Sequence, residues 1–123
     1  MKLSFSDSEL KKYRDNEDIV RQTARQIIKD FALFGLTIEF PAEIKFAYTK
    51  LYKQLEKQIS DLLQSNTATI LSLLYQIDIP ETAIQQKSGE MPDKPLSEVV
   101  TELIFIRELK KVLTRLYFKK HGL

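Results

Sequence analysis

Four basic residues recur at intervals of four near the C-terminal end of the sequence. On an α-helix this spacing puts them on one face. Such a row of positive charge can contact a phosphate backbone or an acidic protein surface. It is also typical of a solvated helix end, where cations favour the negative end of the helix dipole. The members of this C-terminal basic row, which are the candidate contacts for an anionic partner, are Arg107, Lys111, Arg115 and Lys119.

A second charged row lies nearer the start of the chain, at Glu17, Arg21, Arg25 and Lys29. Glu17 and Arg21 form a favourable pair four residues apart, and this N-terminal charged row fits the exposed face of an amphipathic helix. If the two rows faced the same way, they would together favour an anionic partner. The spacing within each helix does not determine their relative orientation, so the sequence leaves this point open.

Glu17 has a further interpretation, because it interrupts an apolar stripe. A buried carboxylate has a raised pKa and can serve in acid–base chemistry. Burial of an unpaired carboxylate is costly, so we favour a helix break that turns Glu17 to solvent, or a salt bridge at the edge of the stripe. Glu98 and Glu102 also share a helix face, but the sequence lacks the Glu-x-x-His motif of di-metal helical sites. A solvated pair of acids is the simpler interpretation.

The residue types that most catalytic chemistry needs are scarce. The chain has no cysteine and one histidine, His121, which argues against thiol catalysis, Cys-ligated zinc, His-based triads and multi-His metal sites. Gly-rich phosphate loops and nucleophile elbows are absent from the sequence. Tyr48, Tyr52 and Tyr75 could line a ligand pocket, but tyrosines on a helical stripe more often lie at the edge of the core. We expect no enzyme activity, no cofactor and no metal site.

The composition predicts one helical domain over residues 1–123. Hydrophobic residues make up 43% and charged residues 29%, which is a globular balance. The chain has 3 Gly and 4 Pro, too few for a turn-rich β domain. The net charge of +2 is milder than that of most nucleic-acid-binding domains. Since the N-terminus lacks a signal-like apolar stretch and no apolar run approaches ~20 residues, we expect a cytoplasmic protein with no membrane partner.

The first predicted helix begins at a capping box over residues 6–9, with Ser6 as the cap. Its apolar residues recur at spacings of three and four, and Gly35 is a good stop signal. The polar run 14–18 either lies within one long helix or breaks it. In the second case Asp15 or Asn16 would cap a second helix.

Residues 36–40 alternate apolar and polar, which is typical of a strand. Because no second alternating run is present to pair with them, we interpret them as an extended connector. The next helix is predicted from Pro41 to Gln64. The side chains that we expect the connector to bury are Leu36, Ile38 and Phe40.

Asn66 is predicted to cap a shorter helix around residues 70–77, which is apolar on most sides and therefore expected at the centre of the core. Pro80 ends or bends this helix, and another helical turn could follow it up to Gln86. A flexible loop is expected at about residues 87–95, which contain Gly89 and Pro92.

The final helix is predicted from Pro95 to Lys120, with Asp93 or Ser97 as its cap. The whole pattern predicts an all-α fold: an irregular helical bundle of three long helices plus one or two short ones.

The final helix carries more apolar residues than one seam of a bundle needs, at Val99, Phe105, Val112 and Phe118. Such a surplus can cover a second surface. We therefore expect a protein-interaction or structural module whose partner is another protein or a second copy of itself, with Phe105 and Phe118 in the apolar interface. The alternative is nucleic-acid or polyanion binding through the C-terminal basic row. A small-molecule pocket, or an enzyme of unrecognised type, is a third interpretation.

Overall fold

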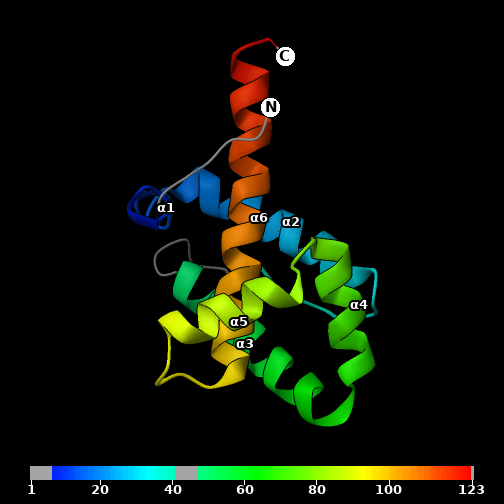
Figure 1. The fold of residues 1–123 in the computed structure, drawn as a ribbon. Helices are drawn as coiled ribbons and strands as arrows, with labels where there is room; N and C mark the ends of the chain where they lie inside the picture. The colour runs from blue at the N-terminus through cyan, green and yellow to red at the C-terminus, as the bar shows by residue number, and fades with distance from the viewer. Residues whose placement is uncertain (1–6, 41–46, 123) are drawn as a thin grey trace.

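The structure, a computed structural model, describes residues 7–40 and 47–122. These residues form six helices and no strand, so the predicted all-α class is confirmed (Figure 1). The helices are α1 (Asp7–Tyr13), α2 (Glu17–Ala32), α3 (Ala47–Ser65), α4 (Thr67–Ile77), α5 (Glu81–Glu90) and α6 (Leu96–Lys120).

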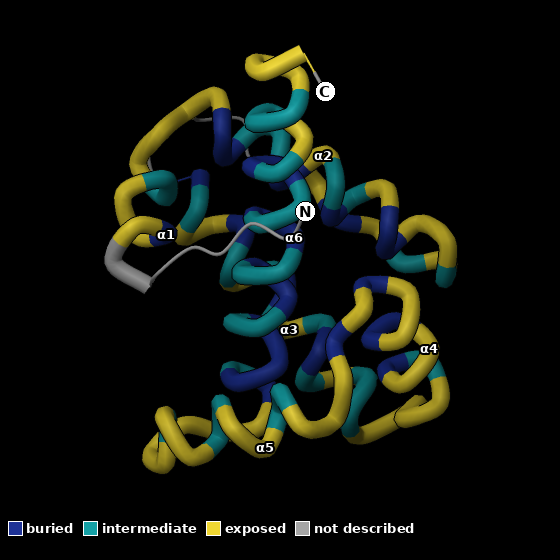
Figure 2. Tube along the Cα trace, turned by 45° about the horizontal axis from the view of Figure 1, so that its top comes forward, coloured by how far each residue is buried: buried dark blue, intermediate teal, exposed yellow. Residues whose placement is uncertain are grey.

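Helix α6 is the central element of the bundle. It has 25 residues and is therefore about 37 Å long. It contacts α2, α3, α4 and α5, and its C-terminal end projects beyond the other helices (Figure 1). Figure 2 shows the buried positions gathered along α6 and on the inner faces of the helices around it. Of the described helices, none is long and apolar enough to cross a membrane.

The polar run 14–18 contains a helix break. Asn16 is the N-cap of α2, and its side chain accepts a hydrogen bond from the backbone N–H of Ile19 at 3.1 Å. Of the two capping residues considered, the structure therefore uses Asn16 and not Asp15. The predicted cap of the preceding helix, Ser6, lies outside the described residues.

Helix α2 ends as the sequence predicts. Gly35 has a φ of +73°, a conformation that glycine adopts without the steric penalty of a Cβ. Its N–H donates to the Ala32 carbonyl, and the N–H of Leu36 donates to the Phe31 carbonyl. These two bonds form the Schellman motif, which satisfies the free carbonyls of the last helical turn.

Residues 36–40 form an extended connector with no partner strand among the described residues. Two side-chain amides of α3 satisfy its backbone instead. Gln54 donates to the Glu39 carbonyl at 2.7 Å and accepts from the Glu39 N–H at 3.0 Å, while Gln58 donates to the Thr37 carbonyl at 2.6 Å.

Of the three connector side chains expected to be buried, Ile38 is buried, Leu36 is half-buried and Phe40 is 36% exposed. The prediction for Phe40 is therefore wrong. Pro41, the predicted first residue of the next helix, lies outside the described residues.

Helix α4 is not central to the core, contrary to the prediction from its composition. Its cap is the predicted residue Asn66, whose side chain accepts from the Thr69 N–H at 3.2 Å. One face of α4 packs inward, but Leu71 and Tyr75 on the other face are 64% and 88% exposed. The longer α6 occupies the centre, so α4 needs to bury only four residues, which are Ile70, Leu73, Leu74 and Ile77.

The connection before α6 is shorter than the loop expected at residues 87–95. Helix α5 continues through Gly89 to Glu90, and an ion pair between Lys87 and Glu90 at 3.5 Å spans its last turn. Pro95 is the N-cap of α6, and no side chain caps this helix end. The prediction of Asp93 or Ser97 as the cap is therefore wrong.

Candidate functional site

Two members of the C-terminal basic row are neutralised within the fold. Arg107 pairs with Asp78 at 3.3 Å. The ammonium group of Lys111 lies 3.1 Å from a carboxylate oxygen of Glu108 and 3.8 Å from one of Asp30. These ion pairs offset part of the positive charge that Arg107 and Lys111 would offer to a partner, and the role of the row stays a prediction. The periodicity that identified the row does not show that Asp78 and Asp30, which are distant in sequence, lie beside it.

The two charged rows of the sequence meet at a groove between α2 and α6. Arg115 of α6 lines this groove opposite Arg25 and Lys29 of α2, and the groove has a volume of about 310 Å³. All three cations are exposed. Lys119 is exposed near the end of α6 and does not line the groove. The lining of this α2/α6 groove is Asp18, Gln22, Arg25, Gln26, Lys29 and Arg115.

The remaining polar side chains of the groove come from one row on α2, where residues 18, 22, 26 and 30 recur at intervals of four. Gln22 donates to Asp18 at 3.3 Å, and Gln26 donates to Asp30 at 3.2 Å. Each acid thus orients the amide next to it. Each amide keeps its carbonyl oxygen and a second N–H for a ligand. Arg21 pairs instead with Glu17, at 3.2 Å, on the exposed surface.

A buried pair of acids lies next to the groove, and sequence reasoning missed it. Glu108 of α6 is 0% exposed and Asp30 of α2 is 4% exposed. Burial raises the pKa of the Glu108 carboxyl to about 8; a side-chain hydrogen bond with Asp30 and the charge of Asp30 add to the shift, and Lys111 opposes it. Neither oxygen of Glu108 accepts a well-aligned hydrogen bond from the described residues. At neutral pH the carboxyl is therefore mostly protonated.

A signal for this pair is present in the sequence. Glu108 lies four residues from both Ile104 and Val112, so it interrupts the apolar stripe of its helix. Glu17 interrupts an apolar stripe in the same way. It is exposed in the first turn of α2, because the helix break precedes it. Glu17 and Glu108 thus have similar sequence surroundings, but Glu17 is exposed and Glu108 is buried.

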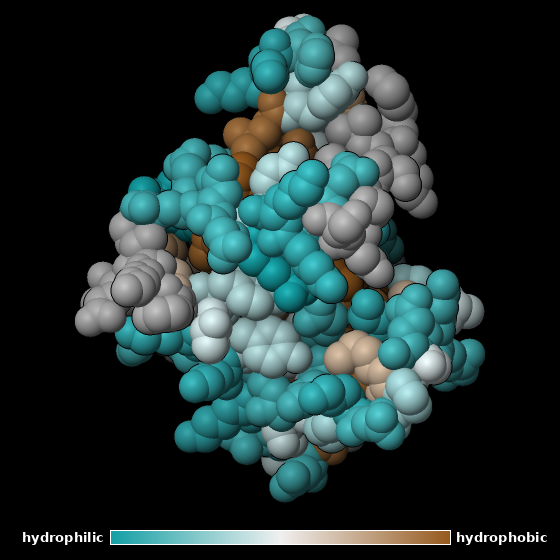
Figure 3. All heavy atoms as spheres, turned by 90° about the vertical axis from the view of Figure 1, so that its left-hand side faces the viewer, coloured by the Kyte–Doolittle hydropathy of each residue, from teal (hydrophilic) through white to brown (hydrophobic). Residues whose placement is uncertain are grey.

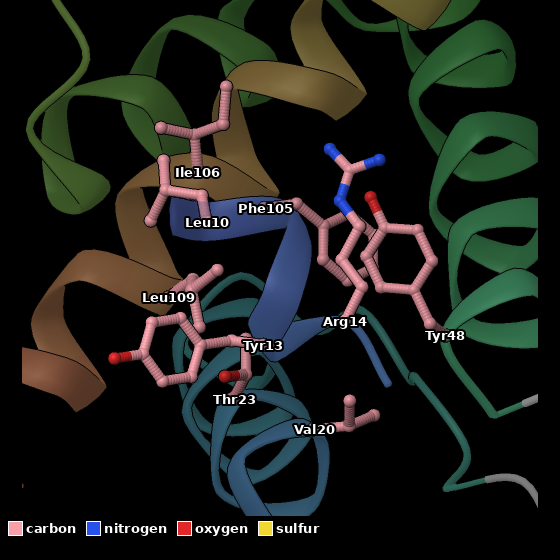
Figure 4. Close-up of a pocket in the computed structure, with 9 residues that line it drawn as sticks. All are labelled: Leu10, Tyr13, Arg14, Val20, Thr23, Tyr48, Phe105, Ile106 and Leu109. Atoms are coloured by element: carbon pink, nitrogen blue, oxygen red, sulfur yellow. The ribbon is translucent and has the colours of Figure 1, made fainter. Parts of the chain in front are cut away.

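A small cavity lies beneath α1, between α2, α3 and α6 (Figure 4). Its volume of about 20 Å³ holds about one water molecule and is far too small for an organic ligand. Arg14 closes it with an ion pair to Glu102 and with its guanidinium 4.8 Å from the centre of the Tyr48 ring. Burial, followed by the charge of Glu102, raises the pKa of Tyr48 well above its ordinary value. We therefore interpret this cavity as a small gap in the packing and not as a ligand site.

Of the two phenylalanines predicted for an apolar interface, Phe105 is buried in the core, whereas the interface role of Phe118 stays a prediction. Phe105 is 3% exposed, and its ring centroid lies 4.8 Å from that of Tyr48 and 5.8 Å from that of Tyr52. It is a core residue, so its assignment to an apolar interface is wrong. Phe118 is half-buried and packs edge-on against Tyr117 at 5.7 Å. Tyr75, the third tyrosine considered for a pocket, is 88% exposed on α4.

The surplus of apolar residues on α6 is absorbed by the fold itself. Val99 and Val112 are 1% and 0% exposed, because α6 is surrounded by other helices along most of its length. The face in Figure 3 is covered mostly by hydrophilic side chains, with a small hydrophobic area below the projecting end of the chain. Burial of Val99, Phe105 and Val112 therefore removes most of the apolar surface of α6 on which the expected protein interface was based, and Phe118 stays half-buried.

Comparisons with protein-family models, with curated proteins and with solved structures find no match to this chain. Within the described residues, no cluster of His, Cys, Asp or Glu side chains has the arrangement of a metal site.

Proposed function

We propose that this chain is a binding module for a phosphate-bearing polyanion, such as a nucleic-acid backbone, which it holds in the α2/α6 groove. One observation carries the proposal: Arg25, Lys29 and Arg115, from two helices distant in sequence, line the same groove. Convergence of both charged rows is the arrangement that favours an anionic partner. A single solvated helix face would not produce it.

The chemistry of the groove suits phosphate oxygens. The two guanidinium groups can each donate a pair of parallel hydrogen bonds to a phosphate, and the Lys29 ammonium adds a compact positive charge. Gln22 and Gln26 supply amide groups for the same oxygens or for sugar hydroxyls. Asp18 offsets part of the charge, but the lining still carries three cations and one acid.

The lining also indicates how such a partner would be recognised. No aromatic side chain is among the six groove residues, so the groove offers no platform on which a base could stack. Contacts to the phosphate backbone fix position but carry no direct sequence information. We therefore expect binding that depends weakly on nucleotide sequence.

A charge-reversal experiment tests the proposal. Arg25→Glu with Arg115→Glu changes the net charge from +2 to −2, because each substitution removes two units. The matched control is Lys53→Glu with Lys57→Glu, which changes the charge equally at exposed positions of α3. Fluorescence anisotropy with a labelled DNA duplex should show at least about tenfold weaker binding for the groove variant than for the control. Equal losses in the two variants would contradict a specific role for the groove.

A further inference from the structure

Three charged side chains form a buried cluster at the contact between α2 and α6, the two helices that line the groove. They are Asp30, Glu108 and Lys111. The two acids are 4% and 0% exposed, and the Lys111 ammonium lies 3.8 Å from Asp30 and 3.1 Å from Glu108. Two acids thus share one cation, so the buried cluster holds an uncompensated negative charge unless one carboxyl is protonated.

The surroundings of Glu108 favour the protonated form. Two neighbouring carboxyls in a site with little water do not readily ionise together. A hydrogen bond joins the Glu108 and Asp30 side chains and requires a proton on one of them, because an ionised carboxylate can only accept. Helix α4, which packs against both α2 and α6, has no charged residue. The charges that act on Glu108 are those of Asp30 on α2 and Lys111 on its own helix.

Both helices connect the buried cluster to the groove. On α2, Gln26 donates to Asp30 at 3.2 Å and also lines the groove, and the groove residue Lys29 directly precedes Asp30. On α6, Arg115 follows Glu108 by seven residues, which is two helical turns or ~10 Å along the axis. Charges at this distance still interact, because salt screens buried groups much less than exposed ones.

We propose that a proton on the buried cluster regulates the α2/α6 groove, which binds its polyanion tightly when Glu108 is protonated and more weakly when Glu108 is ionised. This inference rests on the proposed function of the groove. An ionised Glu108 adds a negative charge behind the cations that hold the phosphates, so it repels the same partner. By linkage, a bound polyanion must raise the proton affinity of Glu108 by the same factor.

The sign and size of the effect follow from the charge and its distance. The pKa of Glu108 is about 8 in the free chain, so the affinity for a polyanion should fall as the pH rises through about 8. Two unit charges ~10 Å apart near a protein surface change a binding constant by about three- to tenfold after screening. The expected change is therefore small beside the loss of a groove cation, but measurable.

Fluorescence anisotropy with the labelled DNA duplex, at constant ionic strength, measures this change. From about pH 6 to about pH 9.5, the parent chain should lose about three- to tenfold in affinity through Glu108. Glu108→Gln stays neutral, so it should bind like the parent chain at the low end and lack this loss. The matched control, Glu90→Gln, removes the same charge from an exposed position of α5, outside the groove, and should keep the pH dependence of the parent chain.

Calorimetry detects the coupled proton directly. Duplex titrations near pH 8, in buffers of different ionisation enthalpy, should show that the parent chain takes up roughly 0.3–0.5 proton more per bound site than Glu108→Gln. The difference between the two chains isolates Glu108, because every other titrating group is common to both. Equal proton uptake in the two chains would overturn the proposal.

Failure of the regulation and failure of the groove as a binding site give different results. If the parent chain and Glu108→Gln bind the duplex with the same pH dependence, the regulation is wrong and the groove proposal stands. If the parent chain does not bind the duplex even at about pH 6, where Glu108 is protonated, both proposals are wrong.

Discussion

Asp30 of α2 and Glu108 of α6 lie together between the two helices that form the groove, and the ammonium group of Lys111 is 3.8 Å from the first and 3.1 Å from the second. Both acids are almost fully buried. Gln26 connects this pair to the groove, because it donates to Asp30 and also lines the groove. The buried cluster therefore lies at the same contact between α2 and α6 that places Arg25, Lys29 and Arg115 in one groove.

The raised pKa of Glu108 predicts a pH dependence of stability. The pKa of Glu108 is about 8 in the fold and 4.5 as the ordinary value, so the unfolded chain loses this proton first as the pH rises. The stabilising contribution of the neutral carboxyl is fully present below pH 4.5 and is lost as the pH rises to about 8. Denaturant unfolding across this range should show a loss of up to about 1.4 kcal/mol per pH unit from Glu108.

Glu108→Gln isolates this contribution, because the amide is neutral at every pH and has nearly the same shape. The variant should lack the Glu108 part of the slope and should be more stable than the parent chain near pH 8. Glu90→Gln, at an exposed position of α5, is the control and should keep the slope of the parent chain. An unchanged slope in Glu108→Gln would contradict the burial of a protonated carboxyl.

The pairing of Lys111 with Asp30 predicts a coupling free energy. Lys111→Met removes the cation but keeps much of the side-chain volume, and it leaves the buried Asp30 carboxylate without its positive neighbour. Because Lys111 is partly exposed, we expect a loss of about 1–3 kcal/mol. Asp30→Asn combined with Lys111→Met should cost less than the two single changes added together, as urea unfolding of the four chains would measure. Strict additivity would show that the two side chains do not interact.

The amide clamp on the connector predicts a local effect. Gln54→Ala leaves both backbone groups of Glu39 without their side-chain partner. Because the site is exposed to water, the loss of unfolding free energy should be about 0.5–1.5 kcal/mol. Hydrogen exchange of the Glu39 amide should become faster, whereas the control Lys53→Ala on the same helix should leave it unchanged. Equal exchange in the two variants would show that Gln54 does not protect this amide.

The features of this fold that depend only on residues adjacent in the sequence could be predicted from the sequence. The caps at Asn16 and Asn66 and the stop at Gly35 each need only a few adjacent residues, and the structure contains all three. The connector was predicted because no strand was available to pair with it. The amides that support it come from α3 and could not be predicted, because nothing in the local pattern links Gln54 to Glu39.

The candidate site was predicted in part. The sequence named every cation of the groove, because basic residues at helical spacing are visible without a fold. It could not place Asp78 beside Arg107 or Asp30 beside Lys111, because these acids lie distant in sequence. The closer acid of Lys111, Glu108, lies three residues away on the same helix. For the same reason Phe105 was assigned to a surface, although Tyr48 and Tyr52 of α3 cover it.

The salt dependence of DNA binding tests the central claim most directly. If Arg25, Lys29 and Arg115 each neutralise one phosphate, a plot of log association constant against log salt concentration should have a slope of about −2.7 for a duplex. Arg115→Gln should reduce the magnitude of this slope by about 1, and Lys53→Gln should leave it unchanged. A slope near zero for the parent chain, or the same reduction in both variants, would contradict the account of the α2/α6 groove as a polyanion site.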